Sequence, residues 1–336
     1  MLKETVGPLC AAYDLAMLDL DGVVYIGRHA IPGAPEHIAR ARAEGMHVAF
    51  VTNNASRSPT EVAEHLVELG VDAAPDDVVT SAQAAAHLLV ERLGRGAAVF
   101  FLGGPGLQLA LQGEGLRAVT KIEDEPVAVV TGYGPDVPWR RLMQGAVLIR
   151  DGLPWVASNA DMTVPMEYGL GPGHGVLVKM LADFSGVAPV VAGKPQRPLL
   201  DETLRRVGGE RPLMVGDRLD TDIEGAHRAG VDSLLVMTGV TSPADLVAAG
   251  PHLRPTFISA TLTGLLVAHP APAVQDGRAA LGGWQAEMSG DALAVWAAAA
   301  DRHPDDWWRV VAALGWHHRE TTGRVADVSG VTAPGP

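Results

Sequence analysis

The sequence has almost no cysteine and no long apolar run. Its 336 residues include one cysteine, Cys10, so no disulfide can form within the chain, and this scarcity fits a reducing compartment. No run of about 18 apolar residues is present, so we expect no membrane span. The N-terminal residues 1–4 begin no apolar segment with a cleavage site, as a secretory signal would. These absences predict a soluble, cytoplasmic protein.

Positive charge is also scarce. The chain has 26 Lys and Arg against 39 Asp and Glu, which gives a formal net charge of −13. Such a chain is repelled by phosphate backbones and anionic lipids, so we expect neither nucleic acid nor a membrane as partner. A small anionic substrate is compatible with this charge, because the local field at a site matters more than the sum. The length allows two or three domains, and an apolar fraction of 47% suffices for packed cores.

Apolar segments of strand length alternate with segments of helical composition along most of the chain. Residues 15–19 and 46–51 are predicted to be buried strands, and 34–44 and 82–93 to be helices. Strands buried on both faces and separated by helices are typical of a parallel α/β sheet. Two segments are predicted to be irregular, a flap at 22–35 and a Gly/Pro-rich loop at 169–175.

The composition changes at His269-Pro270-Ala271-Pro272-Ala273, which predicts a linker. About sixty residues of different character follow. Residues 284–288 and 292–296 are predicted to pair as a hairpin, and 305–315 to form a helix. Adjacent tryptophans at 307 and 308 are predicted to anchor the core of this part.

Two aspartates one residue apart end the first predicted strand, in Asp19-Leu20-Asp21-Gly22. Because side chains alternate along a strand, Asp19 and Asp21 are predicted to share a face while Leu20 points into the fold. Neighbouring carboxylates repel each other, so a chain seldom keeps such a pair without a cation. This stretch is therefore the predicted centre of the chemistry.

Polar residues follow three more predicted strands, so that four clusters stand at strand ends. They are Asp19 with Asp21, Thr52-Asn53-Asn54, Lys194, and Asp217 with Asp222. One such cluster is equally well explained as a turn or cap, whereas four in this order favour a common site, because ligands bind at that edge of an open α/β sheet. Carboxylates suit Mg²⁺, and lysine, threonine and asparagine suit a phosphoryl group. A carboxylate can attack phosphorus, and a second can transfer the proton.

Four motifs resemble those of the haloacid dehalogenase superfamily, in its phosphatase branch with a large (type II) cap. They are Asp19-Leu20-Asp21-Gly22-Val23, Val51-Thr52-Asn53-Asn54, Gly193-Lys194-Pro195 and Val215-Gly216-Asp217-Arg218-Leu219-Asp220-Thr221-Asp222-Ile223. The resemblance covers roughly residues 12–268. The 142 positions from Thr52 to Lys194 fit a cap inserted between the second and third motifs.

The resemblance implies a fold of three parts. We expect a Rossmann-like parallel-sheet core at 1–82 and 187–268, an inserted α/β cap at 83–186, and a small C-terminal α+β domain at 275–336. The last part resembles a truncated acetyltransferase-like domain.

The resemblance also implies residue roles around a Mg²⁺ ion. Asp19 would be the nucleophile and a metal ligand, and Asp21 the acid/base, binding metal through its main-chain carbonyl. Asp217 would bind the metal directly and Asp222 would support it from outside. Val23 stands where the family usually has threonine, in a flap position that leaves the chemistry intact.

The phosphate-binding roles implied by the resemblance fall on the second and third motifs. Thr52 and Asn53 would hold the phosphoryl oxygens, and Lys194 would neutralise Asp19 and the phosphate. Asn54 would orient Asp21. His174, in the predicted cap loop, would contact the substrate.

The resemblance therefore implies a Mg²⁺-dependent phosphomonoester hydrolase acting through an aspartyl-phosphate on a small phosphorylated metabolite, with glycerol 3-phosphate as the expected substrate. Alternatives within the same chemistry are 2-phosphoglycolate and nucleoside monophosphates. From another class, the chain would be a phosphate-binding regulator without activity. The C-terminal segment could also serve as the surface of a homo-oligomer.

Overall fold

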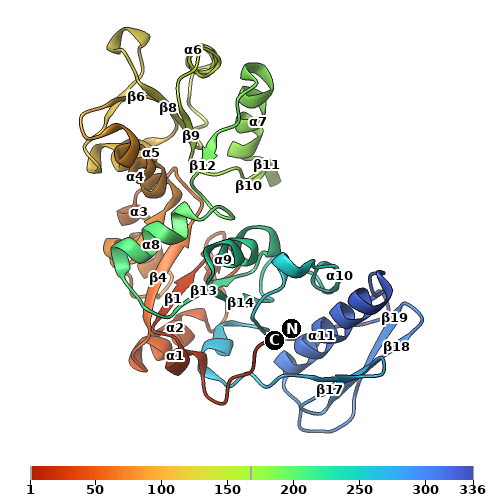
Figure 1. Ribbon diagram of the computed structural model, residues 1–336. Coiled ribbons are helices and arrows are strands. Elements are labelled where there is room, and N and C mark those ends of the chain that lie inside the picture. The colour runs from red at the N-terminus through yellow and green to blue at the C-terminus, as the bar shows by residue number, and fades with distance from the viewer. Residues whose placement is uncertain (1, 167–168, 336) are drawn as a thin grey trace. The chain divides into compact units, whose positions relative to one another are not determined.

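The computed structural model describes residues 2–166 and 169–335 (Figure 1). The chain divides into two compact units. The first unit comprises Met1–Val48, Leu69–Val71 and Gly209–Pro336, and the second comprises Ala49–Glu68 and Asp72–Gly208. Both ends of the predicted cap, residues 83 and 186, lie inside the second unit, so the division into core, cap and C-terminal domain stays a prediction. Among the described helices, none combines the length and apolar character that crossing a membrane requires.

Parallel strands form the centre of the first unit, in the order β15-β14-β13-β1. Their bounds are β1 (Leu15–Leu18), β13 (Pro212–Gly216), β14 (Asp232–Val236) and β15 (Phe257–Ser259). Met17 is in register with Met214, and Val215 with Leu234. Nearly every residue of these strands is buried, as expected for a parallel sheet covered on both faces. The predicted parallel α/β architecture is confirmed.

Short helices and one small hairpin surround these strands. The helical elements are α1 (Leu9–Ala12), α2 (Ala34–Ala43), the π-helical turn η3 (Leu219–Ile223), α9 (Glu224–Ala229), α10 (Pro243–Val247), η4 (Pro251–Leu253) and η5 (Leu262–Leu266). The flap predicted to be irregular contains an antiparallel pair, β2 (Tyr25–Ile26) with β3 (His29–Ala30). β4 (His47–Thr52) begins in the first unit and continues into the second.

The C-terminal segment is an antiparallel sheet with one long helix lying on it (Figure 1). Its elements are β16 (Ala273–Gln275), β17 (Arg278–Leu281), β18 (Trp284–Ser289), β19 (Ala292–Ala297) and α11 (Pro304–Thr322). The predicted hairpin is confirmed, and the helix runs further than predicted. Trp307 is 1% exposed and packs in one core with Leu235 of β14 and Ile258 of β15. The segment therefore shares the hydrophobic core of the parallel strands.

The predicted linker begins at a fixed side chain. His269 is 1% exposed and bonds through Nε2 to the Gly264 carbonyl (2.8 Å). Its Nδ1 faces Arg309 Nη2 of α11 at 3.0 Å. The same guanidinium donates to the Ile258 carbonyl and to Asp306 Oδ1, both at 3.1 Å. Buried polar contacts thus join α11 to β15.

The second unit contains a parallel sheet in the order β12-β9-β8-β6-β7 and the parallel pair β4-β5. Its strands are β5 (Val78–Thr80), β6 (Ala98–Leu102), β7 (Arg117–Val119), β8 (Ala128–Thr131), β9 (Trp155–Ala157) and β12 (Val190–Val191). Its helical elements are α3 (Pro59–Glu68), η1 (Pro75–Asp77), α4 (Ser81–Leu93), α5 (Pro105–Gly113), η2 (Ile122–Asp124), α6 (Trp139–Arg150), α7 (His174–Ser185) and α8 (Pro198–Val207). Phe100, Trp155 and Leu181 are among its core residues.

The prediction of a loop over residues 169–175 was wrong. β10 (Thr163–Met166) and β11 (Gly169–Pro172) form an antiparallel pair, and His174 opens α7. Glycine and proline are turn residues by local preference, but an edge strand tolerates them where a neighbouring strand supplies the hydrogen bonds. The pairing with β10 therefore overrides the local signal.

Candidate functional site

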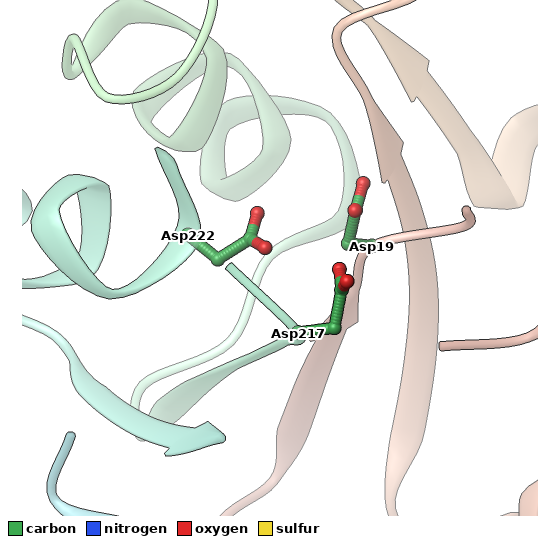
Figure 2. Close-up of side chains that lie close together, drawn as sticks. All are labelled: Asp19, Asp217 and Asp222. Atoms are coloured by element: carbon green, nitrogen blue, oxygen red, sulfur yellow. The ribbon is translucent and has the colours of Figure 1, made fainter. Parts of the chain in front are cut away.

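Three carboxylates meet in the first unit at the ends of parallel strands. Asp19 follows β1, Asp217 follows β13, and Asp222 lies in η3. One oxygen from each lies within 4.8 Å of the others, and Figure 2 shows the three side chains side by side. The Asp19 N–H donates to the Val215 carbonyl (2.8 Å), which holds the ends of β1 and β13 together. Asp217 and Asp222 are buried, and Asp19 is half-buried.

A tight turn follows Asp19. The Leu20 carbonyl accepts the N–H groups of Val23, Val24 and Tyr25 at 3.3, 2.9 and 3.2 Å. Leu20 is 1% exposed, so it points into the fold as the strand alternation predicts. Asp21 is exposed and is not one of the three clustered carboxylates.

Asp217 lies in a slot formed by backbone. The Val240 N–H donates to Asp217 Oδ2 (2.9 Å), and Thr241 Oγ1 donates to the Asp217 carbonyl (2.5 Å). A Cβ at Gly239 would overlap the Asp217 carboxylate, and one at Gly22 would lie 2.5 Å from Oδ2. Because Gly239 and Gly22 have no Cβ, they leave room for the Asp217 carboxylate.

Sequence reasoning missed the segment after β14. Thr238 Oγ1 donates to the Gly22 carbonyl (2.6 Å), so residues 238–241 hold both Asp217 and the turn after Asp19. Small and polar residues directly after a buried parallel strand are the signal that would have found it, because all such strand ends share one edge of the sheet.

Asp222 is held from two sides. Its Oδ2 accepts the Arg218 N–H (3.1 Å), and a Cβ at Gly216 would overlap its carboxyl group. The Arg218 side chain pairs with the exposed Asp220 through Nε and Nη2 at 3.1 and 2.9 Å. Backbone contacts thus fix the Asp222 carboxyl group in its place within the cluster.

The carboxylate cluster fits a hard divalent cation. Carboxylates this close repel one another unless positive charge lies among them. Their oxygens are the ligands that Mg²⁺ and Ca²⁺ prefer, and Mg²⁺ typically uses few carboxylates and keeps positions for water or phosphate. The donor set therefore suits Mg²⁺.

The predicted phosphate-binding residues lie in the second unit. Thr52 ends β4 and is 4% exposed, and Lys194, shortly after β12, is 2% exposed. The Lys194 Nζ donates to the Val51 carbonyl (3.4 Å). The Asn53 side chain bonds to both main-chain polar groups of Lys194, at 2.8 and 3.0 Å. The second and third motifs are thus joined directly.

Asn54 takes part in a local turn. Its N–H donates to Thr52 Oγ1 (3.0 Å), and its Oδ1 accepts the N–H and the hydroxyl of Ser56 at 2.9 and 2.7 Å. These bonds fix the loop after β4. The orienting role toward Asp21 stays a prediction.

His174 is a buried residue at the start of α7. It is 3% exposed, and its Nδ1 lies 2.9 Å from the Asn159 carbonyl, so Nδ1 donates. Burial lowers the pKa of His174 to about 4, and the imidazole is neutral near pH 7. Nε2 has no hydrogen-bond partner within residues 2–166 and 169–335. Contact with a substrate stays a prediction.

Comparison with known proteins agrees with the motifs. A haloacid dehalogenase-like hydrolase family matches residues 16–117, and a second HAD-like hydrolase family matches residues 191–265. D-glycerol 3-phosphate phosphatase of Mycobacterium tuberculosis is 46% identical over 289 residues, which cover 84% of this chain and 78% of that protein. Acid sugar phosphatase of Staphylococcus aureus is 36% identical over 247 residues, 73% of this chain and 93% of the relative.

A solved structure extends the likeness to the whole fold. The crystal structure of glycerol phosphate phosphatase from Mycobacterium tuberculosis in complex with magnesium matches with a TM-score of 0.83 and 42% identity, covering 93% of each chain. Sequence motifs, fold and relatives agree. The chain belongs to the haloacid dehalogenase-like hydrolases.

Proposed function

We propose that the chain is a Mg²⁺-dependent phosphomonoester hydrolase and that its substrate is glycerol 3-phosphate. The observation that carries the proposal is the cluster of Asp19, Asp217 and Asp222 at the ends of parallel strands. The substrate assignment is supported by the 46% identity to a D-glycerol 3-phosphate phosphatase over most of both chains.

Asp19, Asp217 and the main-chain carbonyl of Asp21 would hold the metal ion, and Asp222, which lies in the same cluster, would support it. When bound, it would neutralise charge on the phosphoryl oxygens and on Asp19. The relative solved with magnesium supports this choice of ion.

The proposed reaction has two steps. The Asp19 carboxylate attacks phosphorus, the ester P–O bond breaks, and the leaving alkoxide takes a proton from Asp21. Asp21 then takes a proton from water, whose oxygen attacks phosphorus and breaks the bond to Asp19. Inorganic phosphate and the alcohol are the products, and both aspartates return to their starting states.

Residues of the second unit are proposed to bind the phosphoryl group. Lys194 supplies positive charge, and Thr52 and the Asn53 main chain supply neutral donors. Asn54 is proposed to orient Asp21, and His174 to contact the leaving group.

Phosphate release in the presence of Mg²⁺ tests the activity. We expect turnover by the wild-type chain and none by Asp19→Asn, with the far-UV circular dichroism spectrum unchanged. Asp151→Asn is the matched control, because this exposed carboxylate pairs with its neighbour Arg150 (2.9 Å). Equal turnover in wild type and Asp19→Asn would refute the mechanism, and no turnover by wild type on any phosphomonoester would favour a regulator.

A substrate panel tests specificity. It contains glycerol 3-phosphate, 2-phosphoglycolate, nucleoside monophosphates and sugar phosphates, compared by kcat/KM. Sugar phosphates are the second candidate, because an acid sugar phosphatase is 36% identical over 73% of this chain. A higher kcat/KM for any other member would overturn the assignment of glycerol 3-phosphate.

The proposed compartment is the cytoplasm. Cys10 is a buried free thiol in α1, which supports a reducing environment.

A further inference from the structure

The side chain of Asn53 joins two segments of the second unit that are far apart in sequence. Its Oδ1 accepts the Lys194 N–H (2.8 Å), and its Nδ2 donates to the Lys194 carbonyl (3.0 Å) and to Asp161 Oδ1 (3.1 Å). We infer that Asn53 is a positioning residue that fixes Lys194, and that its side chain does not itself bind the phosphoryl group. The inference rests on the proposed function in one respect, the role of Lys194 in binding phosphate.

The hydrogen-bonding capacity of Asn53 supports this inference. A carboxamide has two N–H donors, and both are used, one by Lys194 and one by Asp161. A phosphoryl oxygen can only accept, so the side chain would have to break one of these bonds to contact it.

The neighbours also determine which atom of the carboxamide is oxygen. If the group were reversed, its oxygen would face the Lys194 carbonyl and the Asp161 carboxylate, and its nitrogen would face the Lys194 N–H. All three contacts would then be unfavourable, because acceptors would face acceptors and donors would face a donor. The orientation with three bonds is the consistent one.

The surroundings hold Asn53 rigidly. Its main-chain carbonyl accepts the Ser81 hydroxyl (2.6 Å) and Asn159 Nδ2 (2.7 Å). Gly193 makes the close approach feasible, because a Cβ there would lie 2.6 Å from Asn53 Oδ1 and 2.8 Å from the Ser158 carbonyl. Because the main chain and the side chain of Asn53 are both held, the side chain offers hydrogen-bonding atoms in fixed positions to the peptide groups of Lys194.

Lys194 needs such support because its side chain is long and flexible. Lys194 is 2% exposed, and its Nζ donates to the Val51 carbonyl at 3.4 Å. The two bonds from Asn53 hold the peptide groups on both sides of the Lys194 Cα, which sets the direction in which the side chain leaves the backbone. Misplacing a catalytic group by about 1 Å can cost about a hundredfold in rate.

A double-mutant cycle separates positioning from direct binding. Asn53→Ala is expected to lower kcat on glycerol 3-phosphate with Mg²⁺ by roughly 10- to 100-fold. In a chain that already carries Lys194→Met, the same change is expected to alter kcat by less than about twofold, because its effect passes through Lys194. Full additivity of the two losses would show that Asn53 contacts the substrate itself and would overturn the inference.

A second measurement needs no activity. The chain has four lysines, Lys3, Lys121, Lys179 and Lys194, so acetylation by an N-hydroxysuccinimide ester can be followed at each one by peptide mass spectrometry. Asn53→Ala is expected to raise the acetylation rate of Lys194 several-fold and to leave the other three unchanged. Unchanged labelling of Lys194 would overturn the inference.

Gln83→Ala is the matched control. This carboxamide accepts the Thr80 N–H (2.8 Å) in the same unit and does not contact Lys194 in the bonds described. Gln83→Ala is expected to lower the stability of the unit without changing the acetylation rate of Lys194. If Gln83→Ala raises this rate as much as Asn53→Ala does, the whole unit has loosened, and a positioning role for Asn53 is refuted.

Asn53→Asp provides a variant of nearly equal volume should the alanine variant fail to fold. It keeps an acceptor for the Lys194 N–H and loses both donors, so the labelling of Lys194 is again expected to rise. If wild type releases no phosphate from any substrate, the proposed function fails, while the labelling result still decides whether Asn53 fixes Lys194.

Discussion

Acid is expected to destabilise the first unit through His269. Its Nδ1 accepts from Arg309, so the ring proton is on Nε2, which donates to Gly264. A proton added at Nδ1 would face the guanidinium. Burial, and next the charge of Arg309, lower the pKa of His269 to about 4 from its ordinary value of 6.5, although the bond to the Gly264 carbonyl and the charge of Asp305 oppose this.

The sign and size of the effect follow from these two values. Below pH 6.5 the unfolded chain binds a proton that the folded chain takes up only near pH 4, so stability falls as the pH falls through this range. Between about pH 7.5 and about pH 5, this one histidine costs about 2 kcal/mol of unfolding free energy. His269→Gln removes the titration and keeps a donor and an acceptor.

Urea unfolding at the two pH values measures the effect. Five of the seven tryptophans (Trp284, Trp296, Trp307, Trp308 and Trp316) lie in the first unit, so tryptophan fluorescence reports mainly on that unit. His269→Gln is expected to be less stable than wild type near neutral pH, yet to lose about 2 kcal/mol less on acidification. His29→Gln, an exposed histidine of β3, should retain the wild-type pH dependence. If His269→Gln retains it too, a buried neutral His269 is refuted.

Two further substitutions test other features. Gly239→Ala is expected to weaken Mg²⁺ binding, measured by calorimetry, by roughly 10- to 100-fold, because the new Cβ displaces the Asp217 carboxylate. Gly113→Ala, where a Cβ meets nothing within 4 Å, should bind normally, and equal affinity in both variants would contradict the slot at Asp217. Trp307→Ala is expected to lower the unfolding free energy by about 3–5 kcal/mol, because it empties a site in the shared core. Trp296→Ala, with 41% of its surface exposed, should cost much less in the same urea titration, and similar losses would count against a core role for Trp307.

The sequence predicted the elements whose signals are local and repeated. The buried strands at 15–19 and 46–51 were found because apolar runs of that length alternate with helices, and the structure has β1 and β4 there. The small hairpins were missed. β10 with β11 and β2 with β3 are stabilised by cross-strand hydrogen bonds, which the composition of a single segment does not reveal.

In the site, too, local sequence signals were predicted correctly and contacts between distant segments were missed. Asp19 and Asp217 each follow an apolar strand directly, so the sequence predicted that they lie close together, and the structure places them in one cluster. Gly239 was missed because its importance depends on the Asp217 carboxylate, which lies 22 positions earlier in the chain and fills the space a side chain would take. The two hydrogen bonds that the Asn53 side chain donates go to Lys194 and Asp161, which are far from it in sequence and close only in the folded chain, so the sequence did not predict them.

Because α11 shares a hydrophobic core with the parallel strands, damage to the C-terminal segment is expected to reach the carboxylate cluster. Leu235 of β14 packs in the same core as Trp307, and β14 ends two positions before residues 238–241, which hold Asp217. A protease cut or heat that detaches α11 would remove this packing from β14, and we expect the proposed metal ligands to loosen before the remaining strands unfold. Metal retention would then report on the integrity of the C-terminal segment, and clipped molecules would lose activity although every proposed catalytic residue is still present.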